Sequence, residues 1–179
     1  MPHTYIALPR GINVGKAKRI SMAELRTSLE GMGFRRVRTL LNSGNVVFES
    51  ESVLDELAPE LIRQHVLTTL GVAAHMSLLT RAELAELIDH NTLAEVASDP
   101  SRLLVHVLRN NPDVELLRPL LDQDWSPEVL ALGPRVAYVW CANGILESKL
   151  APAVAKTLKN QVTARNWSTV LKLKALADR

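Results

Sequence analysis

The sequence predicts an α+β fold made of two ferredoxin-like subdomains in tandem, each with an antiparallel sheet and the element order βαββαβ. Apolar runs of strand length alternate with amphipathic helical segments, and this element order occurs twice along the 179 residues. No sequence repeat accompanies it, so only the succession of elements supports the prediction. We expect an N-terminal subdomain over residues 1–80, a helical connector over 81–101, and a C-terminal subdomain with a closing helix over 102–179.

Each element of the first half has a local signal. A capping box, in which Ser21 accepts a helix N–H and Glu24 reaches back, begins the first helix. Gly44 lies in a turn between two β-rich runs, where glycine tolerates positive φ. Pro59 predicts a kink or a late start in the second helix. The expected elements are strand 4–8, a helix from 21, strands 37–41 and 45–49, a helix within 52–70, and strand 73–79.

The second half repeats this order after a connecting helix. That helix begins with another capping box, from Thr80 to Glu83. The run at 102–108 shows little alternation, which is typical of a strand buried on both faces. The remaining expected elements are a helix from 111, strands 128–132 and 135–141, a helix around 150–158, a short strand at 161–164, and a closing helix from Trp167 to about Ala177.

Positive charge is concentrated at the two ends of the sequence. Residues 1–48 contain eight Lys/Arg and two acidic residues, residues 49–133 contain five and fifteen, and residues 134–179 again contain eight and two. If the two ends meet in the fold, they form a basic face suited to an anionic partner. The alternative is that these charges are scattered over solvated helix faces.

A glycine- and lysine-rich segment, RGINVGKAKR at residues 10–19, follows the first strand. It is not a P-loop, because only three residues separate Gly11 from Gly15 and because Ala17 stands where a hydroxyl would hold magnesium. It is not a dinucleotide-binding fingerprint either, since that needs a third glycine and a parallel βαβ unit. The segment has four cations and no acidic residue, so we expect it to form one wall of an anion site. The alternative is a mobile surface loop.

Several motifs give the chain a family resemblance. They are YIALPRGINVG with SMAELR, then SGNVVF, ESKL and TARNWSTVLKL. Together, from Tyr5 to Leu176, they resemble the bacterial family catalogued as domain of unknown function 1697. The resemblance implies an α+β fold with ferredoxin-like subdomains and implies no biochemical activity. Three exchanges depart from the family pattern: Pro9 replaces an aliphatic residue, Lys16 replaces glycine, and Leu146-Glu147 replaces Gly-Arg.

The resemblance and the loop chemistry together select the candidate ligand-binding residues. Most are Arg, Lys, Asn or Ser in loops or at strand ends, where core packing does not require them. Arg10 and Arg165 suit bidentate contact with an oxyanion, and we expect their guanidinium groups within about one Debye length, roughly 10 Å. Asn42, Asn45 and Asn166 have the alternative role of turn or cap residues. The candidates are Arg10, Asn13, Lys16, Lys18, Ser43, Asn45, Lys149, Arg165 and Asn166.

The sequence has no pattern of catalytic or metal-binding residues. The five histidines lie far apart without metal-ligand spacing, so we expect no metal, and we expect no other cofactor. Ser43 lacks the glycine that a nucleophile elbow places two residues earlier. Cys141 follows an apolar strand, and we expect its thiol to be buried and inert. We name no catalytic residue, and the sequence leaves open whether the protein is an enzyme.

Three functions remain open. The first is a binding protein for an anionic partner, with nucleic acid the leading candidate, because both sequence ends are basic and ferredoxin-like sheets commonly bind RNA. With 4% aromatic residues and the strand NVVFES, a standard RNA-recognition sheet is not expected. The second is an enzyme or small-molecule binder that acts on a phosphate- or carboxylate-bearing metabolite in a cleft between subdomains. The third is a protein-interaction or assembly module, which includes a homo-oligomer.

The composition also predicts a compartment. The single cysteine excludes an internal disulfide and fits a reducing environment. No run approaches the roughly 20 apolar residues of a membrane span, and the first residues lack the pattern of a signal peptide. We therefore expect a cytoplasmic protein with no membrane partner.

Overall fold

The structure is a computed structural model that describes residues 1–16, 18–109, 111–159 and 161–179, without the side chains of 111 and 112. Six α-helices and two four-stranded antiparallel sheets form an α+β fold within these residues. The chain divides into two compact units. Unit 1 comprises Met1–Leu84 and Leu173–Arg179, and unit 2 comprises Ala85–Lys172. Each unit contains one sheet, and the expected subdomain limits at residues 80 and 101 stay predictions.

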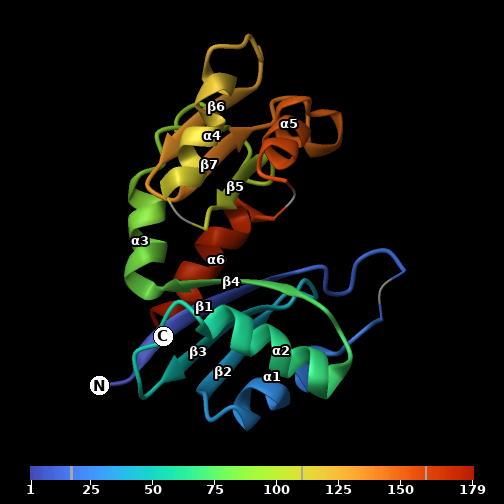
Figure 1. Cartoon of the computed structure of the whole chain (residues 1–179). Coiled ribbons are helices and arrows are strands. Elements are labelled where there is room, and N and C mark those ends of the chain that lie inside the picture. The colour runs from blue at the N-terminus through green and yellow to red at the C-terminus, as the bar shows by residue number, and fades with distance from the viewer. Residues whose placement is uncertain (17, 110, 160) are drawn as a thin grey trace. The chain divides into compact units, whose positions relative to one another are not determined.

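Unit 1 contains a sheet with the strand order β2-β3-β1-β4 (Figure 1). Every neighbouring pair of strands is antiparallel. The capping box of Ser21 and Glu24 is present, and Pro59 lies in the first turn of α2, so the late start is confirmed. The elements are β1 (His3–Arg10), α1 (Met22–Gly31), β2 (Arg35–Leu40), β3 (Asn45–Ser50), α2 (Ala58–Leu70) and β4 (His75–Thr80).

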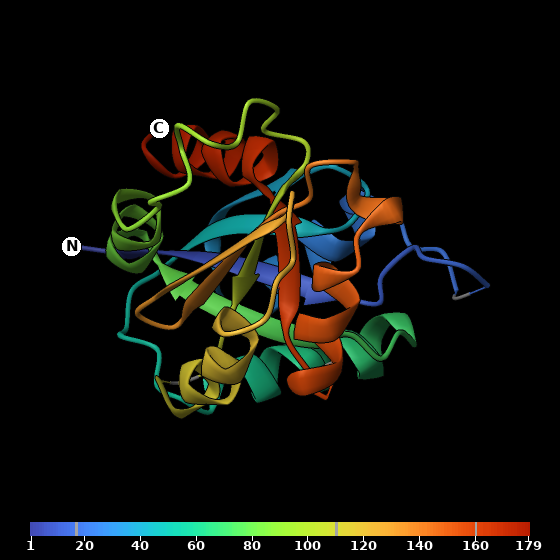
Figure 2. The same cartoon turned by 90° about the horizontal axis from the view of Figure 1, so that it is seen from above.

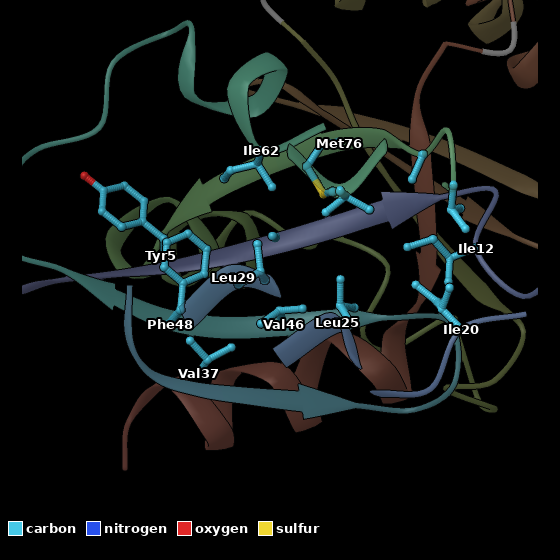
Figure 3. Close-up of a cluster of buried hydrophobic side chains, with 14 residues drawn as sticks. Tyr5, Ile12, Ile20, Leu25, Leu29, Val37, Val46, Phe48, Ile62 and Met76 are labelled. Carbon is cyan, nitrogen blue, oxygen red and sulfur yellow. The ribbon is translucent and has the colours of Figure 1, made fainter. Parts of the chain in front are cut away.

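One face of this sheet packs against α1 and α2 and forms the core of unit 1 (Figure 3). Tyr5 and Phe48 stack there with ring centroids 5.8 Å apart, and Phe34 lies 4.3 Å from Phe48. The Tyr5 hydroxyl accepts a hydrogen bond from the Leu54 N–H at 2.9 Å, which satisfies its polar end. The helices contribute Leu25 and Leu29 from α1, and Ile62 and Val66 from α2.

Unit 2 contains the second sheet, with the order β6-β7-β5-β8. Helices α4 and α5 pack on one face of it, over Ala137, Val139 and Cys141 (Figure 2). The elements are β5 (Leu103–Val107), α4 (Asn111–Leu121), β6 (Val129–Gly133), β7 (Val136–Trp140), the short 3-10 helix η1 (Ile145–Glu147), α5 (Leu150–Thr157) and β8 (Thr163–Asn166). Two further helices, α3 (Arg81–Asp89) and α6 (Trp167–Ala177), each contribute residues to both units.

The second half follows the expected order with one shift. The capping box at Thr80 and Glu83 opens α3, and the closing helix runs from Trp167 to Ala177, as predicted. The last strand begins at Thr163 instead of residue 161. The reason is that the Gln161 N–H still bonds the Leu158 carbonyl, so the turn that ends α5 extends into the expected strand. Among the described residues, no helix is long and apolar enough to cross a membrane.

Candidate anion-binding loop

The segment between β1 and α1, residues 11–20, is termed the cationic loop, and it projects from one end of the sheet of unit 1 (Figures 1 and 2). Its backbone has positive φ at Gly11 (90°), Asn13 (55°) and Gly15 (56°), at every second position. Among the described residues, the N–H groups of 12–16 find no acceptor. A backbone in which residues of positive φ alternate with others can direct successive N–H groups into an anion-binding concavity.

The Asn13 side chain holds this loop in place. Its amide nitrogen donates to the carbonyls of Ile20 and Asn42, each at 2.9 Å, and its amide oxygen accepts from the Ile20 N–H at 2.9 Å. The two hydrogen bonds with Ile20 close the loop on itself. The hydrogen bond to Asn42 ties the loop to the turn between β2 and β3. These bonds give Asn13 a structural role, and contact of its side chain with a ligand stays a prediction.

The cations of the loop differ in what they contact. Lys18 Nζ donates to the Leu70 carbonyl at 2.8 Å, at the negative end of α2, and Arg19 donates to the Asn13 carbonyl. Neither contact neutralises a charge. Hydrogen bonds from Ser21 lower the pKa of the exposed Glu24 carboxyl, and Lys18 lowers it further. Lys16 is exposed, with no ion pair to any described residue.

Arg10 lies at the last position of β1, directly before the loop. The residue is half-buried and pairs with His75 of β4 through the backbone. Its guanidinium makes no hydrogen bond or ion pair with the rest of the described chain. A planar guanidinium without an acceptor in the described chain can make bidentate contact with an oxyanion.

The turn between β2 and β3 supports the loop from one side. Asn45 is completely buried, and its amide donates to the Leu40 carbonyl at 2.9 Å and to Ser43 Oγ at 3.0 Å. Gly44 has φ of 81°, and a Cβ at this position would lie 3.0 Å from Pro9 Cγ. The turn is therefore pressed against the end of β1. Asn45 has the turn-holding role that the sequence allowed, and Ser43 accepts one of its hydrogen bonds. Ligand contact by either residue stays a prediction.

In unit 2, the start of α5 lies within the ESKL motif, residues 147–150, and already holds an anion, the carboxylate of Glu128. The carboxylate of Glu128 accepts from the N–H of Lys149 at 2.8 Å and of Leu150 at 3.3 Å, and the Ser148 hydroxyl donates to it. Ser148 Oγ in turn accepts from the Ala151 N–H at 2.9 Å. The sequence analysis missed Glu128, because no local signal connects it with a serine twenty positions later. Lys149 is exposed and contacts this carboxylate through its backbone N–H.

Arg165 and Asn166 end β8. The Arg165 guanidinium donates to the Ala164 carbonyl at 2.9 Å, and burial lowers its pKa to about 10. Asn166 caps α6, since its side-chain oxygen accepts from the Thr169 N–H at 2.9 Å and from the Thr169 hydroxyl at 2.8 Å. Arg165 belongs to unit 2 and Arg10 to unit 1. Their expected proximity therefore stays a prediction.

The remaining chemistry-bearing residues lie in cores. Cys141 is completely buried, as predicted, and burial raises the pKa of its thiol. His106 is 4% exposed, and burial lowers its pKa to about 4. Tyr5 and Phe48 face the helices, so neither offers a ring on which a nucleic-acid base could stack. The described residues contain no group of three His, Cys, Asp or Glu side chains arranged to hold a metal.

The fold and the loop thus define an α+β protein with a cationic loop at one end of a sheet. The chain belongs to the family described as a protein of unknown function, DUF1697, whose sequence profile matches residues 2–138. It is similar to the solved structure of a conserved bacterial protein from Streptococcus pneumoniae, with a TM-score of 0.77, 24% identity and 100% of both chains covered. At this identity the likeness supports the fold alone. No curated protein matches the chain.

Proposed function

We propose that the protein binds a phosphate-bearing anionic partner through the cationic loop, and that nucleic acid is the leading candidate. One observation carries this proposal. The N–H groups of residues 12–16 lack acceptors in a backbone of alternating φ, and they lie between two cations, Arg10 and Lys16, that have no acidic partner among the described residues. Backbone donors and cations acting together are the usual means of holding a phosphate.

The anchoring of the loop supports the same proposal. Asn13 closes the loop and fixes it to the β2–β3 turn, and Lys18 fixes its second half to the end of α2. A loop that is already ordered loses less conformational entropy when a ligand binds, so more of the interaction energy appears as affinity. Tyr5 and Phe48 are buried, and the partly buried Phe34 packs against the same core, so the contact would be made to phosphate groups and not to stacked bases.

We also infer that each unit is a ferredoxin-like subdomain. Both sheets place their first and third strands at the centre and their second and fourth strands at the edges. In each sheet, helices follow the first and third strands, which is the connectivity of the split βαβ arrangement. In unit 1 the cationic loop is the connection between the first strand and the first helix.

The direct test measures binding of a fluorescently labelled single-stranded RNA of mixed sequence by anisotropy at two salt concentrations. We expect a dissociation constant that rises steeply with salt, because each phosphate contact releases counterions. Arg10→Gln should weaken binding about tenfold or more, since a charge-assisted contact is worth roughly 1.5–3 kcal/mol. The matched control is Arg26→Gln, which removes one exposed charge from α1 and leaves the loop intact.

A second pair of variants separates the contribution of the loop's backbone conformation to RNA binding from the contribution of its charges. Gly15→Val removes no charge but opposes the positive φ of this position, whereas Gly15→Asn tolerates it. We expect Gly15→Val to weaken RNA binding and Gly15→Asn to retain it. If both variants bind as the wild type does, the loop backbone is not the anion site.

The other two functions give different results in the same experiments. A small-ligand site would give no salt-dependent RNA binding and a discrete thermal shift with pyrophosphate or another phosphate-bearing metabolite. An assembly module would bind neither probe. The predicted participation of Arg165 is tested by Arg165→Gln combined with Arg10→Gln. Residues that contact one ligand should give non-additive losses, and independent residues should give additive ones.

A further inference from the structure

The positive charge of unit 1 is concentrated in the cationic loop and in Arg10, the residue before it. Residues 10–19 contain four cations and no acidic residue. Most other described cations of this unit are ion-paired or lie on separate elements. The ion pairs join Arg35 to Glu51, Arg36 to Glu49, Arg63 to Glu60 and Lys174 to Asp178. Arg26, Arg38 and Arg81 lie on three different elements, α1, β2 and α3.

This distribution favours contact with one phosphate group over contact with a run of nucleotides. Binding along the interior of a single strand relies on a basic groove that follows the backbone and on exposed aromatic side chains on which bases stack. In unit 1 the charge is gathered at one loop. Tyr5 and Phe48 are buried, and Phe34 packs against Phe48. The described part of unit 1 therefore offers a single point of attachment.

A phosphate at this point would meet several donors and an excess of positive charge. The N–H groups of residues 12–16 have no acceptor among the described residues, and Arg10 and Lys16 lie at the two ends of this run. Lys18 and Arg19 donate to carbonyl groups, which carry no charge to neutralise them. The loop thus retains more positive charge than a singly charged ligand can balance.

The two kinds of phosphate in nucleic acid differ in charge and in the number of acceptors. A phosphodiester within a strand carries about one negative charge and leaves two oxygens unesterified. A phosphate monoester carries a charge of about −1.5 to −2 at pH 7 and has three strong acceptor oxygens. The monoester can therefore balance two cations and accept from more of the adjacent N–H groups, whereas a diester would leave positive charge uncompensated.

From these observations we propose that the cationic loop recognises a phosphate monoester, which in nucleic acid is the terminal phosphate of a strand. This preference rests on the proposed function, because the same loop makes the contact. The Arg10 guanidinium contacts the group bidentately, while the N–H groups of residues 12–16 and the Lys16 ammonium donate to its oxygens as well. The rest of the strand adds weaker contacts that do not depend on its sequence.

The first test compares three RNAs of the same mixed sequence, each with a fluorescent label at the same internal position. One has a 5′-phosphate, one has a 3′-phosphate, and one has hydroxyl groups at both ends. We expect a phosphorylated RNA to bind about tenfold or more tightly than the RNA without a terminal phosphate, because the added group makes charge-assisted contacts. Lys16→Gln should bring this ratio of affinities close to one. The control, Arg26→Gln on α1, should leave the ratio unchanged.

The pH dependence of the same ratio gives an independent measurement. The second ionisation of a phosphate monoester has a pKa of about 6, whereas a diester does not titrate in this range, so the ratio should decline severalfold from about pH 7.5 to about pH 5.5. Charged protein groups near the loop include His75 opposite Arg10 and Glu24 near Lys18. They are the same in all three complexes and cancel in the ratio.

Calorimetry with a ribonucleoside 5′-monophosphate distinguishes the two sources of a monoester. A dissociation constant similar to that of the phosphorylated RNA, or lower, assigns the site to a small metabolite. A clearly higher one assigns it to a strand end, because only a strand adds contacts beyond the phosphate. Equal affinity for the three RNAs, weakened in each case by Arg10→Gln, overturns the preference for a monoester and leaves the proposed function intact. A protein that binds none of the RNAs and no monophosphate overturns both.

Discussion

The side-chain amide of Asn13 donates a hydrogen bond to the backbone carbonyl of Asn42 at 2.9 Å and so connects two loops that are 29 positions apart in the sequence. The same amide bonds Ile20 in both directions. One side chain thus fixes the closure of the cationic loop and its position against the β2–β3 turn. The stability of the candidate site depends on this residue as much as on any cation.

Removal of the Asn13 side chain should therefore destabilise unit 1. Asn13→Gly keeps the positive φ and deletes the three hydrogen bonds, so we expect the free energy of unfolding to fall by about 1–3 kcal/mol in urea denaturation. Asn13→Asp keeps the acceptor for Ile20 and loses the donors, and its loss should be smaller. Asn143→Ala, at an exposed asparagine, serves as the control. Equal stability of the wild type and Asn13→Gly would contradict the anchoring role.

Substitution of Gly44 and of Gly31 by alanine tests whether the turn at Gly44 requires glycine, with Gly31 as the comparison. Gly44→Ala opposes a φ of 81° and places a Cβ 3.0 Å from Pro9 Cγ, so we expect a loss of about 2 kcal/mol or more. Gly31 ends α1 with no atom within 4 Å of an added Cβ, and Gly31→Ala should be neutral or stabilising by up to about 1 kcal/mol. Thermal unfolding of the two variants tests this difference. If Gly31→Ala had the lower melting temperature, the turn at Gly44 would not be held as described.

Glu128 should be required for the start of α5. Its carboxylate accepts three hydrogen bonds there, and hydrogen bonds to a charged group are each worth about 1.5–3 kcal/mol. We expect Glu128→Gln to lower the free energy of unfolding by at least about 1.5 kcal/mol. Glu147→Gln, at an exposed glutamate nearby, removes the same charge without these contacts and should have little effect. Similar losses in both variants would mean that net charge, not the helix start, is responsible.

The buried His106 should make the folded protein less stable at acidic pH. Burial lowers its pKa in the folded protein to about 4, although a backbone hydrogen bond at Ala137 opposes the effect, and its Nδ1 is buried without a partner. The unfolded chain binds the proton near its ordinary pKa of about 6.5, so the unfolded state gains protons first as the pH falls. Stability should therefore fall between about pH 6.5 and pH 4, by up to about 3 kcal/mol.

Denaturation curves across this pH range test the prediction for His106. His106→Leu should flatten the pH dependence, because an apolar side chain of similar size has no proton to bind. His3→Gln, at an exposed histidine, should keep the wild-type slope. If the slope survives in His106→Leu, carboxyl groups and not this histidine cause the acid lability.

The sequence was sufficient to predict the elements that local signals define. The capping boxes at Ser21 and at Thr80, the late start of α2 at Pro59 and the closing helix from Trp167 each follow from a few neighbouring residues. The βαββαβ order then leads to two antiparallel sheets, because a short turn pairs the second strand with the third and each helix returns the chain to the sheet. The family resemblance pointed to the same fold.

What the sequence could not predict depends on contacts between distant positions. It grouped Asn13 with the cations as a ligand candidate, while the structure shows that the Asn13 side chain makes hydrogen bonds that hold the loop. It named Lys149 as a ligand candidate and gave no sign that Glu128, twenty positions earlier than Ser148, bonds to the start of α5. Side-chain hydrogen bonds of this kind have no periodicity and no fixed spacing, so pattern analysis has nothing to detect.

Unit 1 is built from two segments that are far apart in the sequence, and this has a consequence for synthesis on the ribosome. This unit includes Leu173–Arg179 as well as Met1–Leu84, and the Arg36 guanidinium donates to the Arg179 backbone carbonyl at 2.9 Å. The part of the chain that leaves the exit tunnel first therefore cannot complete its packing until the last residues have followed. Unit 2 is continuous in sequence, so all of it emerges before that moment. A chain truncated before residue 173 and released from the ribosome would contain all residues of unit 2 and lack part of unit 1.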